Sequence, residues 1–388
     1  MAKTGLINVV NVSSLKVPEL VGIYRKGKKV LSLMGPPGCG KTESVREGAK
    51  KEAGKLGLNY VECPTPEDWA NPKNFCFSIV LTSQIEEIDA RGLPHIIEVD
   101  GKKITVFTIT ELFPTKGTGI VFLDEFPNGR TQVQTAMQPM LLNHVAGGYH
   151  ISEDIQFIVA GNRPQDNCGT FYIPYALRNR LQWYEVQSPS TEQLISKMQS
   201  IGKPLHPKLV GWVSSVGSRY VNNFDPKSEQ YAYATPRSLE AGSDMLTVID
   251  KEVVGPKLDA YAQVLGAAMG ENAGLDFRAF LKLSENVDID KLLDNPATIK
   301  RYAADGSDPG LLYSICVNLA ERACDEKQVV KVFKVMEALD QKEFGVFIIN
   351  SMLRQVGNVN AVKLLNKPEL AALISKYHEL VRAVQSVN

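Results

Sequence analysis

The sequence has no long hydrophobic run, because polar and charged residues interrupt its 388 residues too often to leave about 18 apolar positions in a row. Its first residues, MAKTGLINVVNVSS, also lack the extended apolar core of a secretory signal. These two absences argue against a membrane-spanning helix and against secretion. We therefore expect a cytoplasmic protein with no membrane partner.

Paired cysteines and an excess of either charge are also missing. The six cysteines are Cys39, Cys63, Cys76, Cys168, Cys316 and Cys324. They form no CxxC pair and have no histidine at zinc-ligand spacing, which argues against a structural zinc site and a disulfide framework. Lysine plus arginine equals aspartate plus glutamate, at 43 each. No overall electric field therefore draws nucleic acid or an anionic membrane to the chain.

The composition is that of an ordinary globular protein, with 44% hydrophobic and 22% charged residues, and the length indicates two or three domains. From residue 6 to about residue 187, short β-rich runs alternate with helical patterns, which predicts a parallel sheet with helices on both faces. Several runs are apolar throughout, as is typical of buried parallel strands. The expected strands are residues 29–34, 59–62, 119–123, 155–160 and 182–186.

The stretch GLPHIIEVDGKKITVF, residues 92–107, interrupts this pattern. Two alternating segments flank the dipeptide Asp100-Gly101, which is typical of a two-residue hairpin turn. A hairpin inserted between two parallel strands has no place in their sheet. We therefore expect it to project from the α/β body.

After residue 186 strand signals become sparse and helical patterns take over. The segment SPSTEQLISKM begins with a capping-box pattern, Ser190 followed by Gln193. Two apolar stripes at helical spacing follow, and we expect them to face a core, with a subunit contact as the alternative. They are Val329, Val332, Phe333 and Met336, and then Leu370, Ile374, Tyr377, Val381 and Val384. We predict three parts: residues 1–188 with the hairpin, a helical part at 189–254 and a helical C-terminal extension at 255–388.

The stretch MGPPGCGKTES, residues 34–44, links an expected strand to a charged helical pattern. Its glycines lack the β-carbon that would block positive φ and shield the amides, so successive N–H groups can form a cradle for anions. A helix that begins near Lys41 adds its positive N-terminal end. The match to GxxxxGK[ST] predicts that Lys41 reaches the β- and γ-phosphates of a nucleotide and that the Thr42 hydroxyl binds Mg²⁺. The expected nucleotide-binding residues are Gly35, Pro36, Pro37, Gly38, Cys39, Gly40, Lys41, Thr42 and Glu43.

Hydrolysis of a bound nucleotide also needs a carboxylate for the metal and a group that activates water. GIVFLDEFPN supplies Asp124 and Glu125 where a buried strand ends, at the edge where parallel sheets bind their ligands. We expect Asp124 to hold Mg²⁺ through its waters and Glu125 to polarise the attacking water. The alternative for such an acidic pair is a helix cap.

Two further stretches carry polar residues that fit the same site. In IQFIVAGNRP, Asn162 could orient the attacking water, although a turn would also explain it. In IPYALRNRLQ, Arg178 and Arg180 could neutralise transition-state charge, a role that an arginine can fill from another subunit. We expect Arg180 in that role and keep Arg178 as the second candidate; a helix surface is the alternative for both.

Together these motifs resemble those of the AAA+ ATPases, and of the MoxR type among them. GPPGCGKT resembles the Walker A motif, IVFLDE resembles Walker B, and AGN resembles sensor 1. ALRNRL is similar to the arginine-finger segment, although Phe usually stands where this chain has Leu181. ATPRSLEAGSDML resembles the sensor 2 helix, which makes Arg237 the lid residue that faces the γ-phosphate. The hairpin occupies the position of the helix-2 insert of that clade. The similarity spans about residues 17–250 and becomes looser beyond residue 255.

The resemblance implies an α/β fold: a P-loop αβα sandwich with a parallel sheet, followed by a helical lid and a helical C-terminal extension. It implies ATP and Mg²⁺ as cofactors and a homo-oligomeric ring, commonly a hexamer, that remodels a protein client. Such proteins often act beside a partner with a von Willebrand factor A domain. Two alternatives stay open, a nucleic-acid motor or loader and a nucleotide-gated scaffold with little turnover. The neutral charge balance counts against the first, and the complete set of Asp124, Glu125, Asn162 and Arg180 counts against the second.

Overall fold

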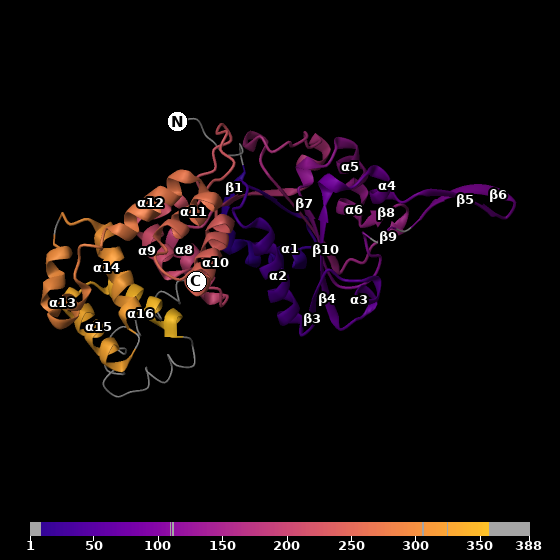
Figure 1. The fold of residues 1–388 in the computed structure, drawn as a ribbon. Coiled ribbons are helices and arrows are strands. Elements are labelled where there is room, and N and C mark those ends of the chain that lie inside the picture. Colours follow the sequence, from indigo (N-terminus) through magenta and orange to yellow (C-terminus); the bar gives the residue numbers. More distant parts are fainter. Residues whose placement is uncertain (1–8, 109, 111, 305, 324, 357–388) are drawn as a thin grey trace. The chain divides into compact units, whose positions relative to one another are not determined.

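The computed structural model of the chain describes residues 9–108, 110, 112–304, 306–323 and 325–356, and the chain forms two compact units (Figure 1). The α/β unit comprises Met1–Pro189 and Phe224–Ser228. The helical unit comprises Ser190–Asn223 and Glu229–Asn388. The three-part division that the sequence indicates stays a prediction. No helix of the described residues is both long enough and apolar enough to cross a bilayer.

The α/β unit is built on a seven-stranded sheet with the order β1-β11-β2-β10-β7-β4-β3, in which every pair is parallel. All five expected strands are present, with bounds that differ from the prediction by at most two residues. Two further strands, β1 and β4, were not predicted. The strands are β1 (Val10–Ser13), β2 (Leu31–Met34), β3 (Asn59–Glu62), β4 (Asn74–Leu81), β7 (Gly119–Asp124), β10 (Ile155–Gly161) and β11 (Gln182–Gln187).

Helices cover both faces of this sheet, because alternate residues of a strand point in opposite directions. On β7, Ile120 and Phe122 belong to the core that α1 and α2 cover. Val121 and Leu123 belong to a separate core on the other face, under α5 and α6. The predicted αβα sandwich is therefore confirmed. The helices of this unit are α1 (Val17–Lys26), α2 (Lys41–Leu56), α3 (Pro66–Ala70), α4 (Glu87–Arg91), α5 (Thr131–Ala136), α6 (Gln138–Asn143) and α7 (Tyr175–Arg178).

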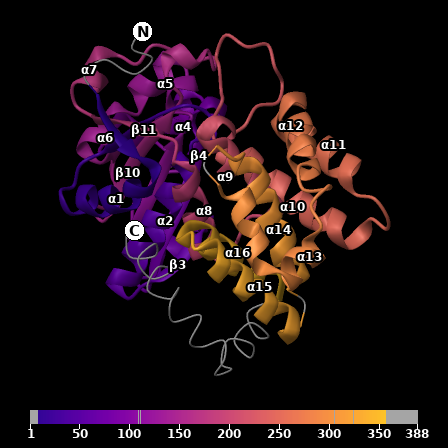
Figure 2. The same cartoon turned by 90° about the vertical axis from the view of Figure 1, so that its left-hand side faces the viewer.

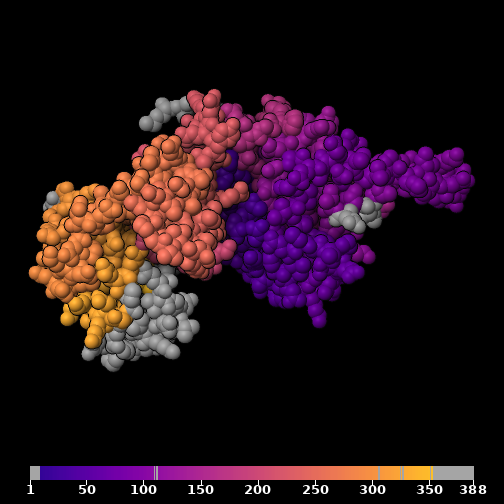
Figure 3. Space-filling view, viewed as in Figure 1, coloured from indigo at the N-terminus to yellow at the C-terminus, as the bar shows by residue number. Residues whose placement is uncertain are grey.

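The predicted hairpin is also confirmed. Strands β5 (Pro94–Val99) and β6 (Lys102–Phe107) pair antiparallel, and their turn residues Asp100 and Gly101 have positive φ values of 50° and 75°. The hairpin stands clear of the rest of the α/β unit (Figures 1 and 3). Ile96 is 66% exposed and Ile104 is 42% exposed, so apolar side chains on the hairpin face solvent. A smaller hairpin, β8 (Val145–Ala146) and β9 (Tyr149–His150), follows α6.

The helical unit contains no strand among its described residues, as the sparse strand signals predicted. Ser190 caps its first helix by accepting a hydrogen bond from the Gln193 amide, which confirms the capping box. The stripe at 329–336 is buried in the core of this unit, whereas the stripe at 370–384 lies outside the described residues. Three of the later helices, α14 to α16, pack together (Figure 2). The helices are α8 (Thr191–Ser200), α9 (Pro207–Val216), α10 (Pro236–Glu252), α11 (Leu258–Met269), α12 (Glu271–Lys282), α13 (Ile289–Asp294), α14 (Pro309–Arg322), α15 (Glu326–Leu339) and α16 (Lys342–Val356).

Candidate nucleotide-binding site

The phosphate loop, residues 35–42, connects the end of β2 to the first turn of α2. Gly38 and Gly40 have φ values of 71° and 93°, in the left-handed region that favours glycine. Gly35 has no room for a side chain, because a β-carbon there would lie 2.7 Å from the Val186 carbonyl oxygen on β11. Two of the glycines therefore allow the turn and the third allows close packing against the sheet.

Lys41 lies at the start of α2 and is only 8% exposed. Its ammonium donates hydrogen bonds to the carbonyl oxygens of Gly35 and Pro36, at 2.9 and 3.0 Å, and to Asn162 Oδ1 at 3.2 Å. The fold thus brings together Lys41 and Asn162, which lie 121 residues apart in the sequence. These three acceptors are uncharged oxygens, and a fourth contact, at 3.9 Å, goes to the Cys39 thiol. The contacts therefore leave the positive charge of Lys41 available to an anion.

Thr42 and Asp124 also meet in the structure. The Thr42 hydroxyl donates a hydrogen bond of 2.7 Å to Asp124 Oδ2, at the carboxyl end of β7. The other carboxylate oxygen, Asp124 Oδ1, accepts from the Glu125 amide at 2.9 Å. Hydroxyl and carboxylate oxygens are ligands that Mg²⁺ takes, so this pair fits the predicted metal site.

Glu125 follows β7 with a φ of 53°, a left-handed conformation that is uncommon outside glycine and often marks a functional position. Its carboxylate accepts a hydrogen bond from the Ser83 hydroxyl. Ser83 lies in a short 3₁₀ turn, Thr82–Gln84, directly after β4, which pairs with β7. Sequence reasoning did not find Ser83, because it did not predict β4.

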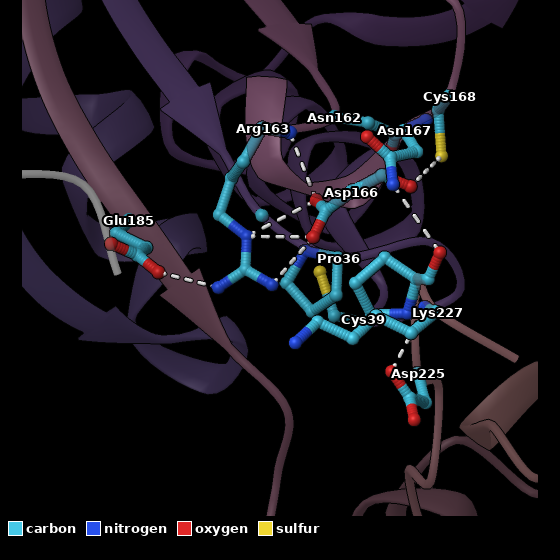
Figure 4. A network of polar contacts seen from close by, with 12 residues as sticks. Pro36, Cys39, Asn162, Arg163, Asp166, Asn167, Cys168, Glu185, Asp225 and Lys227 are labelled. Atoms are coloured by element: carbon cyan, nitrogen blue, oxygen red, sulfur yellow. Dashed lines mark hydrogen bonds and ion pairs between the residues drawn. The ribbon is translucent and has the colours of Figure 1, made fainter. Parts of the chain in front are cut away.

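Arg163, the residue after Asn162, is the centre of a buried ion-pair network (Figure 4). Its guanidinium donates to Asp166 Oδ1 and to Glu185 Oε1, both at 2.7 Å. The side chains of Asp166 and Glu185 are 0% and 2% exposed. Burial lowers the pKa of Arg163, but hydrogen bonds to the two carboxylates raise it above its usual value, so Arg163 is charged. Arg163 was not among the predicted site residues, although a carboxylate three positions after it is a signal for such a pair.

The same network reaches a segment that is distant in sequence. The Asn167 side-chain amide donates a hydrogen bond of 3.3 Å to the carbonyl oxygen of Pro226, which lies within Phe224–Ser228 (Figure 4). These five residues belong to the α/β unit, whereas the residues on either side of them belong to the helical unit. Sequence reasoning gave no sign of this contact.

Two of the predicted nucleotide-binding residues have further features. Cys39 is buried, and this burial raises the pKa of its thiol, although Lys41 acts in the opposite direction. The thiol is therefore protonated near neutral pH and less reactive than an exposed one. Glu43 forms an ion pair with Arg46 on the surface of α2, and its side chain is 53% exposed.

The three arginine candidates lie at different places. The Arg178 guanidinium lies 4.1 Å from the ring centre of Tyr172, and Tyr175 packs beside it, so Arg178 is held by aromatic contacts. Arg180 is exposed and lines an open cleft with residues of α5 and α6. Arg237 is the second residue of α10 in the helical unit, so its position relative to Lys41 stays a prediction.

Residues 31–182 match the sequence model of the family described as ATPase family associated with various cellular activities (AAA). Similar solved structures include NtrX from Brucella abortus in complex with ADP, at 14% identity over 90% of this chain and 69% of that one, with a TM-score of 0.39. The complex of the same protein with ATP gives 15% identity over 81% and 70%, with a TM-score of 0.37. A mutant of RuvB from Thermotoga maritima gives 15% identity over 78% and 83%, with a TM-score of 0.32.

No curated protein matches the chain. The matched segment begins at the first residue of β2 and ends at the first residue of β11, so it contains the phosphate loop, Asp124, Glu125 and Asn162. Residues 31–182, which carry these groups, are therefore similar in sequence to the AAA ATPase family.

Proposed function

We propose that the protein is a Mg²⁺-dependent ATPase of the AAA+ type that binds the nucleotide in its phosphate loop. The observation that carries the proposal is the 2.7 Å contact between Thr42 and Asp124 beside the buried Lys41. A hydroxyl, a carboxylate and an ammonium thus lie at one edge of the sheet, where the amides of the loop precede the first turn of α2. This set of groups suits a triphosphate with its metal.

Each side chain has a distinct role in the proposed reaction. Lys41 binds the β- and γ-phosphates, and Thr42 and Asp124 hold the metal. Mg²⁺, when bound, neutralises charge on the phosphate oxygens. Glu125 polarises the attacking water, and Asn162 orients that water against the γ-phosphate.

Glu125→Gln tests the reaction, because it keeps the shape of the side chain and removes its basicity. We expect the variant to bind ATP and to lose turnover by about a hundredfold or more. Glu67→Gln is the matched control, since Glu67 is exposed on α3. Steady-state ATPase rates and nucleotide titrations give the two readouts. Unchanged turnover in Glu125→Gln would remove Glu125 from its role, and no affinity for any magnesium nucleotide would remove the whole proposal.

We further propose that the chain forms a homo-oligomeric ring, with six subunits as the expected number, in which an arginine from one subunit completes the site of the next. Both arginines are exposed, but the Arg178 guanidinium already packs on tyrosine rings, which favours Arg180 for this role. Co-expression of Lys41→Ala and Arg180→Ala subunits tests this. If the arginine acts between subunits, mixed rings contain some intact sites and recover activity that neither variant has alone. Absence of recovery in verified mixed rings would contradict it.

We also propose that hydrolysis drives remodelling of a protein client, in the manner of the MoxR type, with a von Willebrand factor A domain protein as the partner. The exposed isoleucines of the β5–β6 hairpin support a protein client, because they offer an apolar contact. The test adds an unfolded polypeptide or a polynucleotide to the ATPase assay. Stimulation by polynucleotide that weakens with rising salt would instead support the nucleic-acid motor.

A further inference from the structure

We propose that Arg163 is a positioning residue, which holds Asn162 and the start of the phosphate loop in place without touching the nucleotide. This inference rests on the proposed function, because it assigns Asn162 a part in hydrolysis. Its physical basis is the buried network of Arg163, Asp166 and Glu185 (Figure 4).

The first part of the network fixes the chain directly after Asn162. The Arg163 amide donates to Asp166 Oδ2 at 2.9 Å, and the Arg163 guanidinium donates to Asp166 Oδ1 at 2.7 Å. Main chain and side chain of Arg163 are thus bound to one carboxylate, which closes residues 163–166 into a tight turn. Asn162 is the last residue before this turn, so the turn limits the directions in which its amide can point.

The second part of the network spans the strand that leads into the phosphate loop. In the sheet, β2 lies between β10 and β11, and Met34 at its end is paired with Gly161 on one side and with Glu185 on the other. Arg163 follows β10 and Glu185 lies on β11, so their ion pair connects the two strands on either side of β2. The Gly35 amide, the first of the loop, donates to the Gly161 carbonyl oxygen at 3.2 Å. The position of Gly35 therefore depends on the same network of Arg163, Asp166 and Glu185, which we call the clamp.

The geometry of the clamp depends on arginine and not only on a positive charge. The Arg163 side chain is 14% exposed and contacts two carboxylates that are almost fully buried. A planar guanidinium can donate to both carboxylates in fixed directions, whereas a lysine ammonium is a point charge on a flexible chain. Arg163→Lys therefore keeps the cation and loses the directed bridge, while Arg163→Ala would remove the cation that bridges the two buried carboxylates and could fail to fold.

The kinetic test compares Arg163→Lys with the wild type in the full-length protein. We expect kcat to fall about tenfold, because the water-orienting amide is displaced, while the dissociation constant for ATP stays within about twofold. In an Asn162→Ala background, Arg163→Lys should cause little further loss, because Arg163 acts through Asn162. Arg91→Lys is the control, since Arg91 pairs with Glu87 on the surface, where both side chains are about half exposed. An equal loss of kcat in both backgrounds would overturn the proposal.

A second measurement needs no turnover, so it separates this proposal from the proposed function. The side-chain amide resonance of Asn162 can be assigned by NMR from its loss in Asn162→Ala. We expect this resonance to shift in Arg163→Lys and to stay in place in Arg91→Lys. An unchanged resonance in a folded Arg163→Lys protein would overturn the positioning role, whatever the ATPase assay shows. A shifted resonance in a protein without ATPase activity would support the clamp and contradict the proposed function.

Discussion

Gly161 offers a direct test of how closely the catalytic segments must lie. It is the last residue of β10, directly before Asn162, and it packs against Pro127, two residues after Glu125. A β-carbon at position 161 would lie 2.1 Å from Pro127 Cδ, whereas ordinary contact begins near 3.4 Å. The two segments would have to separate by about 1.3 Å, the difference between these distances. Gly161 is not among the glycines with positive φ, so the strain in Gly161→Ala is steric.

We expect Gly161→Ala to lower kcat by about a hundredfold, because a displacement near 1 Å between groups that act together costs roughly that factor. Overpacking of this kind should also lower the free energy of unfolding by about 1–3 kcal/mol. ATPase rates at saturating ATP give the first quantity, and chemical unfolding gives the second.

The matched control is Gly54→Ala, inside α2, where a β-carbon would meet nothing within 4 Å. It should raise the free energy of unfolding by about 0.5–1 kcal/mol through helix propensity and leave kcat unchanged. A Gly161→Ala protein with wild-type kcat would refute the reasoning. The contact with Pro127 would then not set the spacing between Asn162 and Glu125.

Three further predictions concern other parts of the chain. Phe277→Ala should lower the free energy of unfolding of the helical unit by about 3–5 kcal/mol, because the ring is fully buried and its centre lies 5.4 Å from the ring centre of Trp212. The control is Leu275→Ala, at a 54% exposed position, which should change that free energy by less than about 0.5 kcal/mol in the same denaturant titration. Burial raises the pKa of Asp250, but hydrogen bonds from His206 and Tyr261 outweigh this effect and hold the pKa well below its usual range. The ionised carboxylate therefore stabilises the fold at neutral pH, and this contribution is lost as the pH falls. Asp250→Asn should cost about 1 kcal/mol at pH 7, limited by the 40% exposure of the carboxylate, and progressively less below about pH 4; a loss that is independent of pH would contradict the assignment. Replacement of residues 94–107 by Asn-Gly should preserve the thermal midpoint and the basal ATPase rate, because Leu93 and Thr108 already form two hydrogen bonds of 2.9 Å with each other. The same replacement should abolish client remodelling. A lost fold or an unchanged remodelling rate would contradict the proposed role of the hairpin.

The sequence predicted the parts of the fold whose signals are local. The five apolar strands, the Asp100-Gly101 turn and the Ser190 cap depend on neighbouring residues, and all are present. Strand β1 was missed because it has four residues and lies at the sheet edge, partly exposed. Strand β4 was missed because its run, NFCFSIVL, is apolar without a clear period, which does not distinguish a strand from a buried helix.

The candidate site shows the same limit. Thr42 and Asp124 could be expected to meet, because each follows a buried strand in a recognisable motif. The Arg163–Glu185 pair could not, because it depends on β11 lying beside β2, and the order of strands in a sheet is not written in the spacing of residues. The contact between Ser83 and Glu125 could not be predicted either, because it depends on β4 pairing with β7.

The position of Phe224–Ser228 has a consequence for synthesis of the protein. Translation proceeds from the N-terminus, so the ribosome makes residues 190–223 of the helical unit before it makes the last five residues of the α/β unit. The α/β unit cannot make its Asn167–Pro226 contact until that later segment has emerged. A nascent chain stopped near residue 190 would thus carry the complete sheet but not the complete unit.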